Sequence, residues 1–316
     1  MKTISTLLTE LQQNSATARF KFINILAILV GLIFCLLVNF VPNFNELYAY
    51  PLTFVVVISL GLIHGSLDYD VEANHEPATN RFAFSVKYIL QMTIVATIWM
   101  AAPSIAFALF ILFTAWHFGE TDFSLFKVKF EPVIVLVYGI GITGWILGNH
   151  IPERADFIAS LPYFATNPAN LGASLKMFTL LVSMVSLALI LIAVIASKMY
   201  LKPTAVIALA TLLTFTWYLP LLLAFTFYFG FWHSMHTINL IMNDIKINAK
   251  VLVIKSIPYL GTSIAIGVVT VILLGALEFN TELALFIFIS ALTLPHASIM
   301  HKMLKRYRSA VHLQWF

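Results

Sequence analysis

Two hydrophobic segments of the sequence end in the same order of residue types: a histidine, then a glycine, then an acid. They read GLIHGSLDYD, which ends at Asp70, and TAWHFGETDF, which ends at Phe123. Ionisable side chains are costly in an apolar environment, and they usually face the interior of a helix bundle, where they pair with one another or with an ion. A histidine at the same point of two such segments therefore indicates a site with its own chemistry.

The histidines of the chain divide into two groups. Six lie in or at the end of apolar runs: His64, His117, His233, His236, His296 and His301. Three fall in predicted loops or in the C-terminal tail: His75, His150 and His312. One membrane histidine is equally well explained by a hydrogen bond within the packing. Five at a matched depth predict a shared centre, because helix bundles build metal sites from side chains on facing helices.

The ligand types narrow the choice of metal. Several neutral imidazoles without thiolates favour iron, copper, zinc or nickel over magnesium or calcium. The candidate metal ligands are His64, His117, His233, His236 and His296. His233 and His236 are three residues apart, so both lie on one face of a helix. The single cysteine, Cys35, lies in the first apolar run and is expected to be a buried apolar thiol.

Two acids follow the first two histidines closely. Asp68 comes four residues after His64, and Asp122 comes five residues after His117. Both are near enough to accept a hydrogen bond from the N–H group of a metal-ligating imidazole. The alternative for both is a solvated helix end at the membrane surface.

Membrane helices must position these side chains. Hydrophobic residues make up 60% of the 316-residue chain and charged residues 10%, with a mean hydropathy of +0.93. Soluble domains carry about 25% charged residues. A helix of roughly 20 residues crosses the bilayer, and fewer suffice when one end is buried in protein. Ten apolar runs come close to that length: 21–41, 50–65, 83–102, 104–118, 132–148, 174–197, 203–219, 221–241, 259–277 and 282–303.

The fold expected is all-α, a polytopic transmembrane bundle of about ten helices, with eight or twelve as alternatives. Pro103 and Pro220 separate two pairs of runs, as turns or as kinks. No repeat, low-complexity tract or soluble domain interrupts the chain, so residues 1–316 are predicted to form a single domain. The six membrane histidines all lie on even-numbered runs, near the same side of the bilayer.

The basic residues predict the orientation, since Lys and Arg accumulate in cytoplasmic loops. Ten spans with a cytoplasmic N-terminus place sixteen of the eighteen basic residues on the cytoplasmic side and leave Arg154 and Lys176 outside. Both termini are then cytoplasmic, residues 1–20 form a cytoplasmic tail, and the protein is multi-pass in the cell inner (plasma) membrane. The net charge of +4 faces anionic lipid and gives no indication of nucleic acid.

Four histidine motifs resemble those of a known family. HGSLD from His64, WHFGETD from Trp116, FWHSMH from Phe231 and LPHASIMH from Leu294 resemble the motifs of the Brp/Blh family of membrane carotenoid 15,15'-dioxygenases. The resemblance runs from the second predicted helix to the last. It implies a non-haem Fe(2+) enzyme that uses O2 to split β-carotene at its central double bond into two retinal molecules, with a functional link to a retinal-binding opsin.

The same resemblance implies a ligand set. His64, His117, His233 and His236 are the first-choice iron ligands, and His296 competes for one place. The third motif of the family often has its second histidine four residues after the first, where this chain has Thr237. That difference strengthens the case for His296. Beyond the metal centre, no catalytic acid or base is expected.

Aromatic residues beside the histidines are candidates for lining a tunnel for the polyene substrate: Trp116, Phe118, Tyr228, Phe231 and Trp232. Ordinary membrane packing is the alternative for each of them.

Three other functions were weighed against this one. A di-iron desaturase would need clustered histidine boxes that the chain lacks. A haem protein needs only two axial histidines. A histidine-lined transporter would use acidic relays, and no Asp or Glu lies in the predicted bilayer core.

Overall fold

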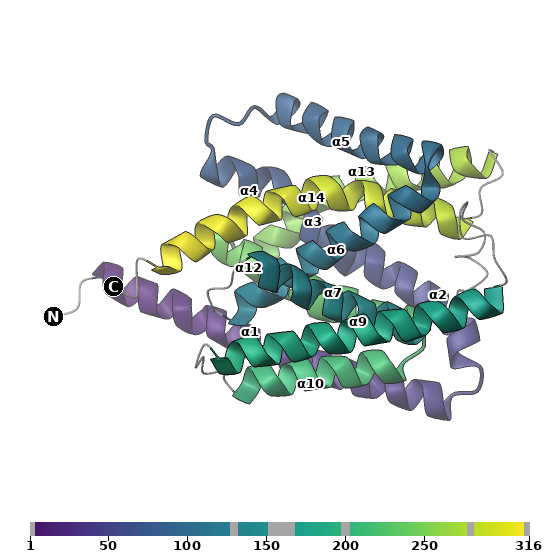
Figure 1. Ribbon diagram of the computed structural model, residues 1–316. Coiled ribbons are helices and arrows are strands. Elements are labelled where there is room, and N and C mark those ends of the chain that lie inside the picture. The colour runs from purple at the N-terminus through teal and green to yellow at the C-terminus, as the bar shows by residue number, and fades with distance from the viewer. Residues whose placement is uncertain (1–3, 127–131, 151–167, 197–202, 277–280, 313–316) are drawn as a thin grey trace. The chain divides into compact units, whose positions relative to one another are not determined.

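The structure is a computed structural model, and it describes residues 4–126, 132–150, 168–196, 203–276 and 281–312 (Figure 1). Every regular element in these ranges is a helix. In the described residues, each of the ten predicted apolar runs lies on helix, and the predicted all-α fold of about ten helices is confirmed. The predicted separation of apolar runs at Pro103 and Pro220 is also confirmed. One helix ends at Ala101 and another at Tyr218, just before these prolines.

Six helices of the described part are long and apolar enough to cross a membrane: Ala18–Phe40, Phe44–His75, Arg81–Ala101, Pro103–Asp122, Pro132–His150 and Ala249–Leu273. Two further apolar helices are shorter, Lys176–Leu189 and Val206–Tyr218. Long, apolar and exposed surfaces of this kind fit a multi-pass membrane protein. The orientation of the termini and the choice of the plasma membrane stay predictions.

The chain forms two compact units. The first comprises Met1–Leu67 and Ile207–Ser256, and the second comprises Asp68–Val206 and Ile257–Phe316. The chain therefore passes from one unit to the other three times, and two of these passages fall inside helices. The single domain over residues 1–316 stays a prediction.

The first unit is built around two π-helical segments, η1 and η3. Its elements are α1 (Ile4–Phe40), α2 (Phe44–Val56), η1 (Val57–Gly61), α3 (Leu62–Gly65), most of α10 (Pro203–Tyr218), α11 (Leu221–Phe225), η3 (Thr226–Ser234), α12 (Met235–Asp244) and the start of α13 (Ala249–Ala276). Helix α1 packs against η3 and α12, and η1 packs against η3.

Glycines let the two π segments lie close together. A Cβ atom on Gly61 would stand 2.6 Å from the Phe229 ring, and one on Gly230 would stand 2.2 Å from a methyl group of Val56. Next to this contact the hydroxyls of Thr53 and Thr226 are 2.6 Å apart. π-Helical turns are rare, and they are frequent at functional sites. Segment η1 ends three residues before His64, and η3 contains His233.

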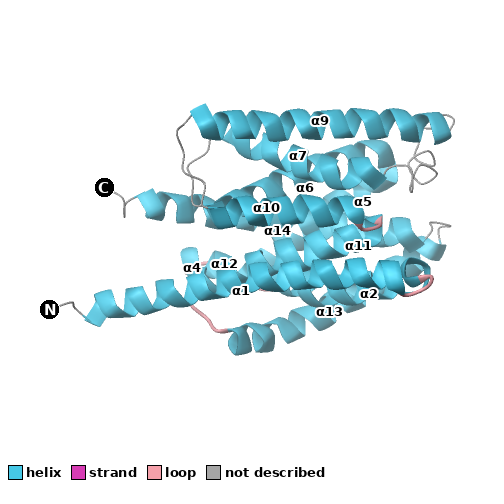
Figure 2. Cartoon of the chain, turned by 90° about the horizontal axis from the view of Figure 1, so that it is seen from below, coloured by secondary structure: helices cyan, strands magenta, loops and turns pink. Residues whose placement is uncertain are grey.

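The second unit holds the remaining helices. They are α4 (Asp68–His75), α5 (Arg81–Ala101), α6 (Pro103–Phe126), α7 (Pro132–His150), α9 (Pro168–Ala196), α14 (Thr281–His312) and the rest of α13. Helix α7 lies beside α9, as Figure 2 shows, and it also packs against α6. Helix α14 packs against α4, α5 and α6.

Several predicted boundaries differ from the observed helices. Helix α1 begins at Ile4, inside the predicted tail 1–20, and α13 begins at Ala249 rather than at Tyr259. His75, His150 and His312 are the last residues of α4, α7 and α14, not loop residues. An apolar run in the sequence indicates only the part of a helix that contacts lipid. The helix itself continues for as long as its backbone hydrogen bonds are made, so its ends can lie beyond the apolar run.

Helices α6 and α7 meet through two glycines. A Cβ atom on Gly139 would stand 1.8 Å from the carbonyl oxygen of Ala115, and one on Gly119 would stand 2.3 Å from the carbonyl oxygen of Val135. Both distances are far below van der Waals contact, and backbone atoms cannot move aside cheaply. Small residues at helix contacts let membrane helices approach closely. Gly119 thus allows close packing, and α6 continues past it to Phe126.

We predict that Gly139→Ala destabilises the protein by about 1 to 3 kcal/mol, the usual cost of overpacking a tight contact. The measurement is the midpoint of thermal unfolding in detergent. Gly261→Ala is the matched control, because a Cβ atom there has no neighbour within 4 Å. That control should unfold at the wild-type temperature or slightly above it, since alanine favours helix over glycine. Equal midpoints for both variants would contradict the close contact.

Candidate metal centre

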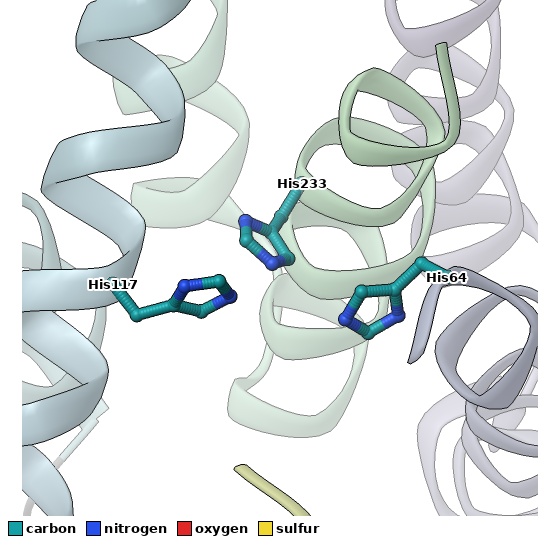
Figure 3. A group of neighbouring side chains, drawn as sticks. All are labelled: His64, His117 and His233. Atoms are coloured by element: carbon teal, nitrogen blue, oxygen red, sulfur yellow. The ribbon is translucent and has the colours of Figure 1, made fainter. Parts of the chain in front are cut away.

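The first unit holds two buried imidazoles that face each other, His64 of α3 and His233 of η3. Their relative exposures are 6% and 0%. The ring centroids are 5.4 Å apart with the planes at 85°, and a ring nitrogen of one lies within 4.8 Å of a ring nitrogen of the other. Figure 3 shows these two side chains pointing toward one another, and it also draws His117 of the other unit.

The Ser234 hydroxyl lies beside Nδ1 of the His64 ring. The Ser234 hydroxyl donates to the carbonyl oxygen of Phe229 at 2.7 Å, and its oxygen lies 3.3 Å from His64 Nδ1. A hydroxyl has only one hydrogen, and that of Ser234 is used in the bond to Phe229. Toward His64 the Ser234 oxygen can therefore only accept, from Nδ1–H. In the neutral ring the lone pair is then on Nε2, where it could bind a metal.

Aromatic rings enclose the His233 imidazole. Tyr228 and Phe229 stack on it with centroid distances of 6.5 and 6.1 Å and interplanar angles of 26° and 17°. The Phe229 ring also meets His64 edge-on at 5.6 Å. One aromatic ring therefore touches both imidazoles. Such a wall restricts ring rotation and makes the surroundings apolar.

The second unit holds another imidazole pair, His117 of α6 and His296 of α14. Their ring centroids are 5.1 Å apart with the planes at 84°. Both side chains are buried, and the Phe118 ring lies 6.1 Å from the His117 ring. The geometry is close to that of the pair in the first unit.

Asp68 at the start of α4 holds the His296 ring. The two groups are joined by a hydrogen bond of 2.8 Å from His296 Nδ1 to Asp68 Oδ1, and Tyr88 donates its hydroxyl to Oδ2 at 3.0 Å. Carboxylates only accept hydrogen bonds, so His296 carries its proton on Nδ1. In the neutral ring, Nε2 then has the lone pair. Asp68 itself is buried.

The chemistry of this donor set fits a transition metal. Each unit contains two buried imidazoles. In each pair one imidazole, His64 or His296, has an oxygen acceptor beside Nδ1. Neutral imidazole is the commonest metal ligand in proteins, and an oxygen partner on the other ring nitrogen is its usual support. The side chains of His64, His117 and His233 are all buried, and each imidazole could serve as a metal ligand.

A family model described as Beta-carotene 15,15'-dioxygenase matches residues 55–304 and so includes both imidazole pairs. The chain belongs to this beta-carotene 15,15'-dioxygenase family. A curated protein named Beta-carotene 15,15'-dioxygenase, from Uncultured marine bacterium 66A03, is 24% identical over 268 residues, which cover 82% of this chain and 95% of that protein. No solved structure matches the chain.

In this beta-carotene 15,15'-dioxygenase family member, the remaining candidate ligand, His236, packs against α1. Its Nε2 lies 3.1 Å from Asn24 Oδ1, and its ring lies 5.1 Å from Phe20 and 5.0 Å from Trp232. His233 instead contacts the rings of His64, Tyr228 and Phe229. The three-residue spacing predicted a common face, but His233 lies in a π-helical turn and His236 in an α-helix, so the α-helical spacing does not apply between them.

Two of the five aromatic candidates lie beside the paired histidines. Phe118 neighbours His117, and Tyr228 stacks on His233. Elsewhere, Trp116 lies 6.0 Å from the ring of His301, Phe231 lies 6.1 Å from the ring of Phe34, and Trp232 lies beside His236. The tunnel role of all five stays a prediction.

Both predicted acids are buried, so neither is a solvated helix end. Asp68 accepts from His296, although the spacing placed it near His64. Asp122 accepts from the Tyr138 hydroxyl at 3.1 Å.

Sequence reasoning missed two residues that support the paired histidines, Ser234 and Tyr88, and one buried acid that pairs with a histidine outside these pairs, Glu120. Ser234 stands next to His233 and could have been found as a neighbour of a candidate ligand. Glu120 is buried in the second motif and accepts from His301 Nδ1 at 2.8 Å. Tyr88 lies twenty residues from Asp68, and no local pattern points to it.

Proposed function

We propose that this protein splits β-carotene with O2 at the central 15,15' double bond to give two retinal molecules. The observation that carries the proposal is the family match, which includes all four histidine motifs. The name of the curated relative supports the same activity. One carbon–carbon double bond breaks and two carbonyl bonds form, so each aldehyde receives one oxygen atom and no further oxidant or reductant is needed.

We propose Fe(2+) as the cofactor, held by His64, His117, His233 and His296. His64 and His296 have Nδ1 held by oxygen atoms, so Nε2 can bind the metal. His296 is favoured over His236, because its ring pairs with His117 and a carboxylate supports it. Bound iron would supply the redox chemistry through which O2 reacts with the alkene.

The chain's own residues would bind and orient the substrate and exclude water. β-Carotene is long and apolar and dissolves in the lipid, so it can reach a membrane-embedded site without crossing water. Tyr228 and Phe229 form an aromatic surface beside His233, suited to a conjugated chain. We place the protein in the inner (plasma) membrane and propose a retinal-binding opsin as the recipient of the product.

The first test of the activity is expression in β-carotene-producing cells under aeration. We expect the cells to lose their yellow colour and to accumulate retinal, which chromatography of the extracted pigments measures. Cells with the empty vector are the control. Unchanged β-carotene in cells that contain folded protein would refute the proposed function.

Replacing a ligand should abolish retinal formation. We predict this for His64→Ala, His117→Ala and His233→Ala, each assayed at matched expression. His75→Ala is the control, because His75 ends α4 and has no role in the proposed site. A variant of the first three that forms retinal at the wild-type rate would remove its histidine from the ligand set.

Iron content distinguishes His236 from His296. We expect purified His296→Ala to lose bound iron and His236→Ala to keep about one equivalent per chain, because His236 is engaged with Asn24. Elemental analysis of both purified proteins measures this. The reverse result would assign the fourth position to His236, and full iron in both would exclude both from the ligand set.

A further inference from the structure

Three acids of one short segment pair with three basic or imidazole side chains of α14. Asp68 pairs with His296 at 2.8 Å, Glu72 with Lys302 at 2.5 Å, and Glu76 with Arg306 at 3.0 Å. The acids are four residues apart, so they lie on one face of α4 and its last turn. The backbone N–H of Glu76 bonds to the carbonyl of Glu72, which extends that turn. We call these three contacts the α4–α14 ladder.

The ladder changes from buried to exposed along its length. The acid side chains are 3%, 10% and 54% exposed at Asp68, Glu72 and Glu76. An exposed ion pair contributes little to stability, whereas a buried acid is strongly destabilising once its charged partner is removed. The Asp68–His296 contact therefore requires α4 and α14 to be placed accurately. The Glu72–Lys302 contact lies one helical turn away and can hold the two helices in that position.

We propose that Asp68 positions His296 as a metal ligand and that the Glu72–Lys302 pair holds Asp68 in register. The inference rests on the proposed function, since it concerns the same metal. Asp68 Oδ1 takes the Nδ1 proton of His296, which fixes the tautomer and the ring orientation and makes Nε2 the metal donor. Tyr88 holds the other oxygen, so the carboxylate cannot rotate away.

This arrangement also explains why two similar histidines differ. The acceptor for His236 is the neutral amide of Asn24, whereas the acceptor for His296 is a carboxylate. A charged acceptor makes a stronger hydrogen bond and raises the basicity of the opposite ring nitrogen. His296 is therefore the better metal donor of the two.

The first measurement is iron affinity without turnover. Purified apoprotein is titrated with Fe(2+) in the absence of oxygen and of substrate. We expect Asp68→Asn to bind iron roughly 10- to 100-fold more weakly than wild type, the usual cost of losing such a support. Tyr88→Phe is the milder variant and should weaken binding by a smaller factor. Wild-type affinity in Asp68→Asn would overturn the proposal.

A charge exchange tests the middle contact. Glu72→Lys should weaken iron binding, because it places two cations against each other, and the double variant Glu72→Lys with Lys302→Glu should restore it. A merely structural role for the ladder would lower the unfolding midpoint and leave the affinity of the folded protein unchanged. Failure of the double variant to recover iron binding, with its helix content intact by circular dichroism, would refute the registering role.

Glu120→Gln is the matched control. Glu120 is a buried acid that also accepts from a histidine, His301, yet it lies outside the ladder. We expect this variant to bind iron as wild type does, and equal weakening in Glu120→Gln and Asp68→Asn would overturn the specific role of Asp68. Wild-type protein that binds iron but makes no retinal would refute the proposed function and leave the affinity comparison intact, whereas wild-type protein that binds no iron would refute both.

Discussion

A neutral imidazole has one N–H and one lone pair, and burying it in an apolar bundle fixes the use of both. The N–H must meet an acceptor, since a buried donor without one costs more than the hydrogen bond itself contributes. Ser234 accepts from His64, and Asp68 accepts from His296. Each acceptor takes the Nδ1 side and leaves the Nε2 lone pair to the other side of the ring. The requirement to satisfy one nitrogen thus prepares the other for a metal.

The backbone around the histidines departs from regular α-helix in the first unit. The η3 segment makes the Ser234 hydroxyl reach back five residues to Phe229, which is the spacing of a π-helical turn. The same turn stacks Tyr228 and Phe229 on His233. Gly61 and Gly230 then let η1 and η3 lie close enough for Phe229 to touch His64 as well. The local irregularity and the paired imidazoles are therefore parts of one arrangement.

The helices were predictable because a helix that crosses a membrane needs a continuous run of apolar residues of a known length, which can be read directly from the sequence. The π-helical turns were not, since their residue types are those of any apolar helix and only the backbone hydrogen bonds differ. The partner of Asp68 was also beyond local reasoning. A four-residue spacing implies contact with His64 only within one continuous helix, yet α3 ends at Gly65 and α4 begins at Asp68. The role of His236 depended on Asn24, more than two hundred residues away.

The glycine contact between α6 and α7 has a thermodynamic consequence for the proposed metal site. Gly119 lies two residues after His117, so the backbone that carries this histidine is seated directly on α7. None of the proposed iron ligands is on α7. Separation of the two helices would move His117 while the other ligands keep their own supports. If the proposed metal binds there, lipids or detergents that loosen this one helix pair would lower its occupancy before the bundle as a whole unfolds, and loss of metal would be the earliest sign of an unsuitable bilayer.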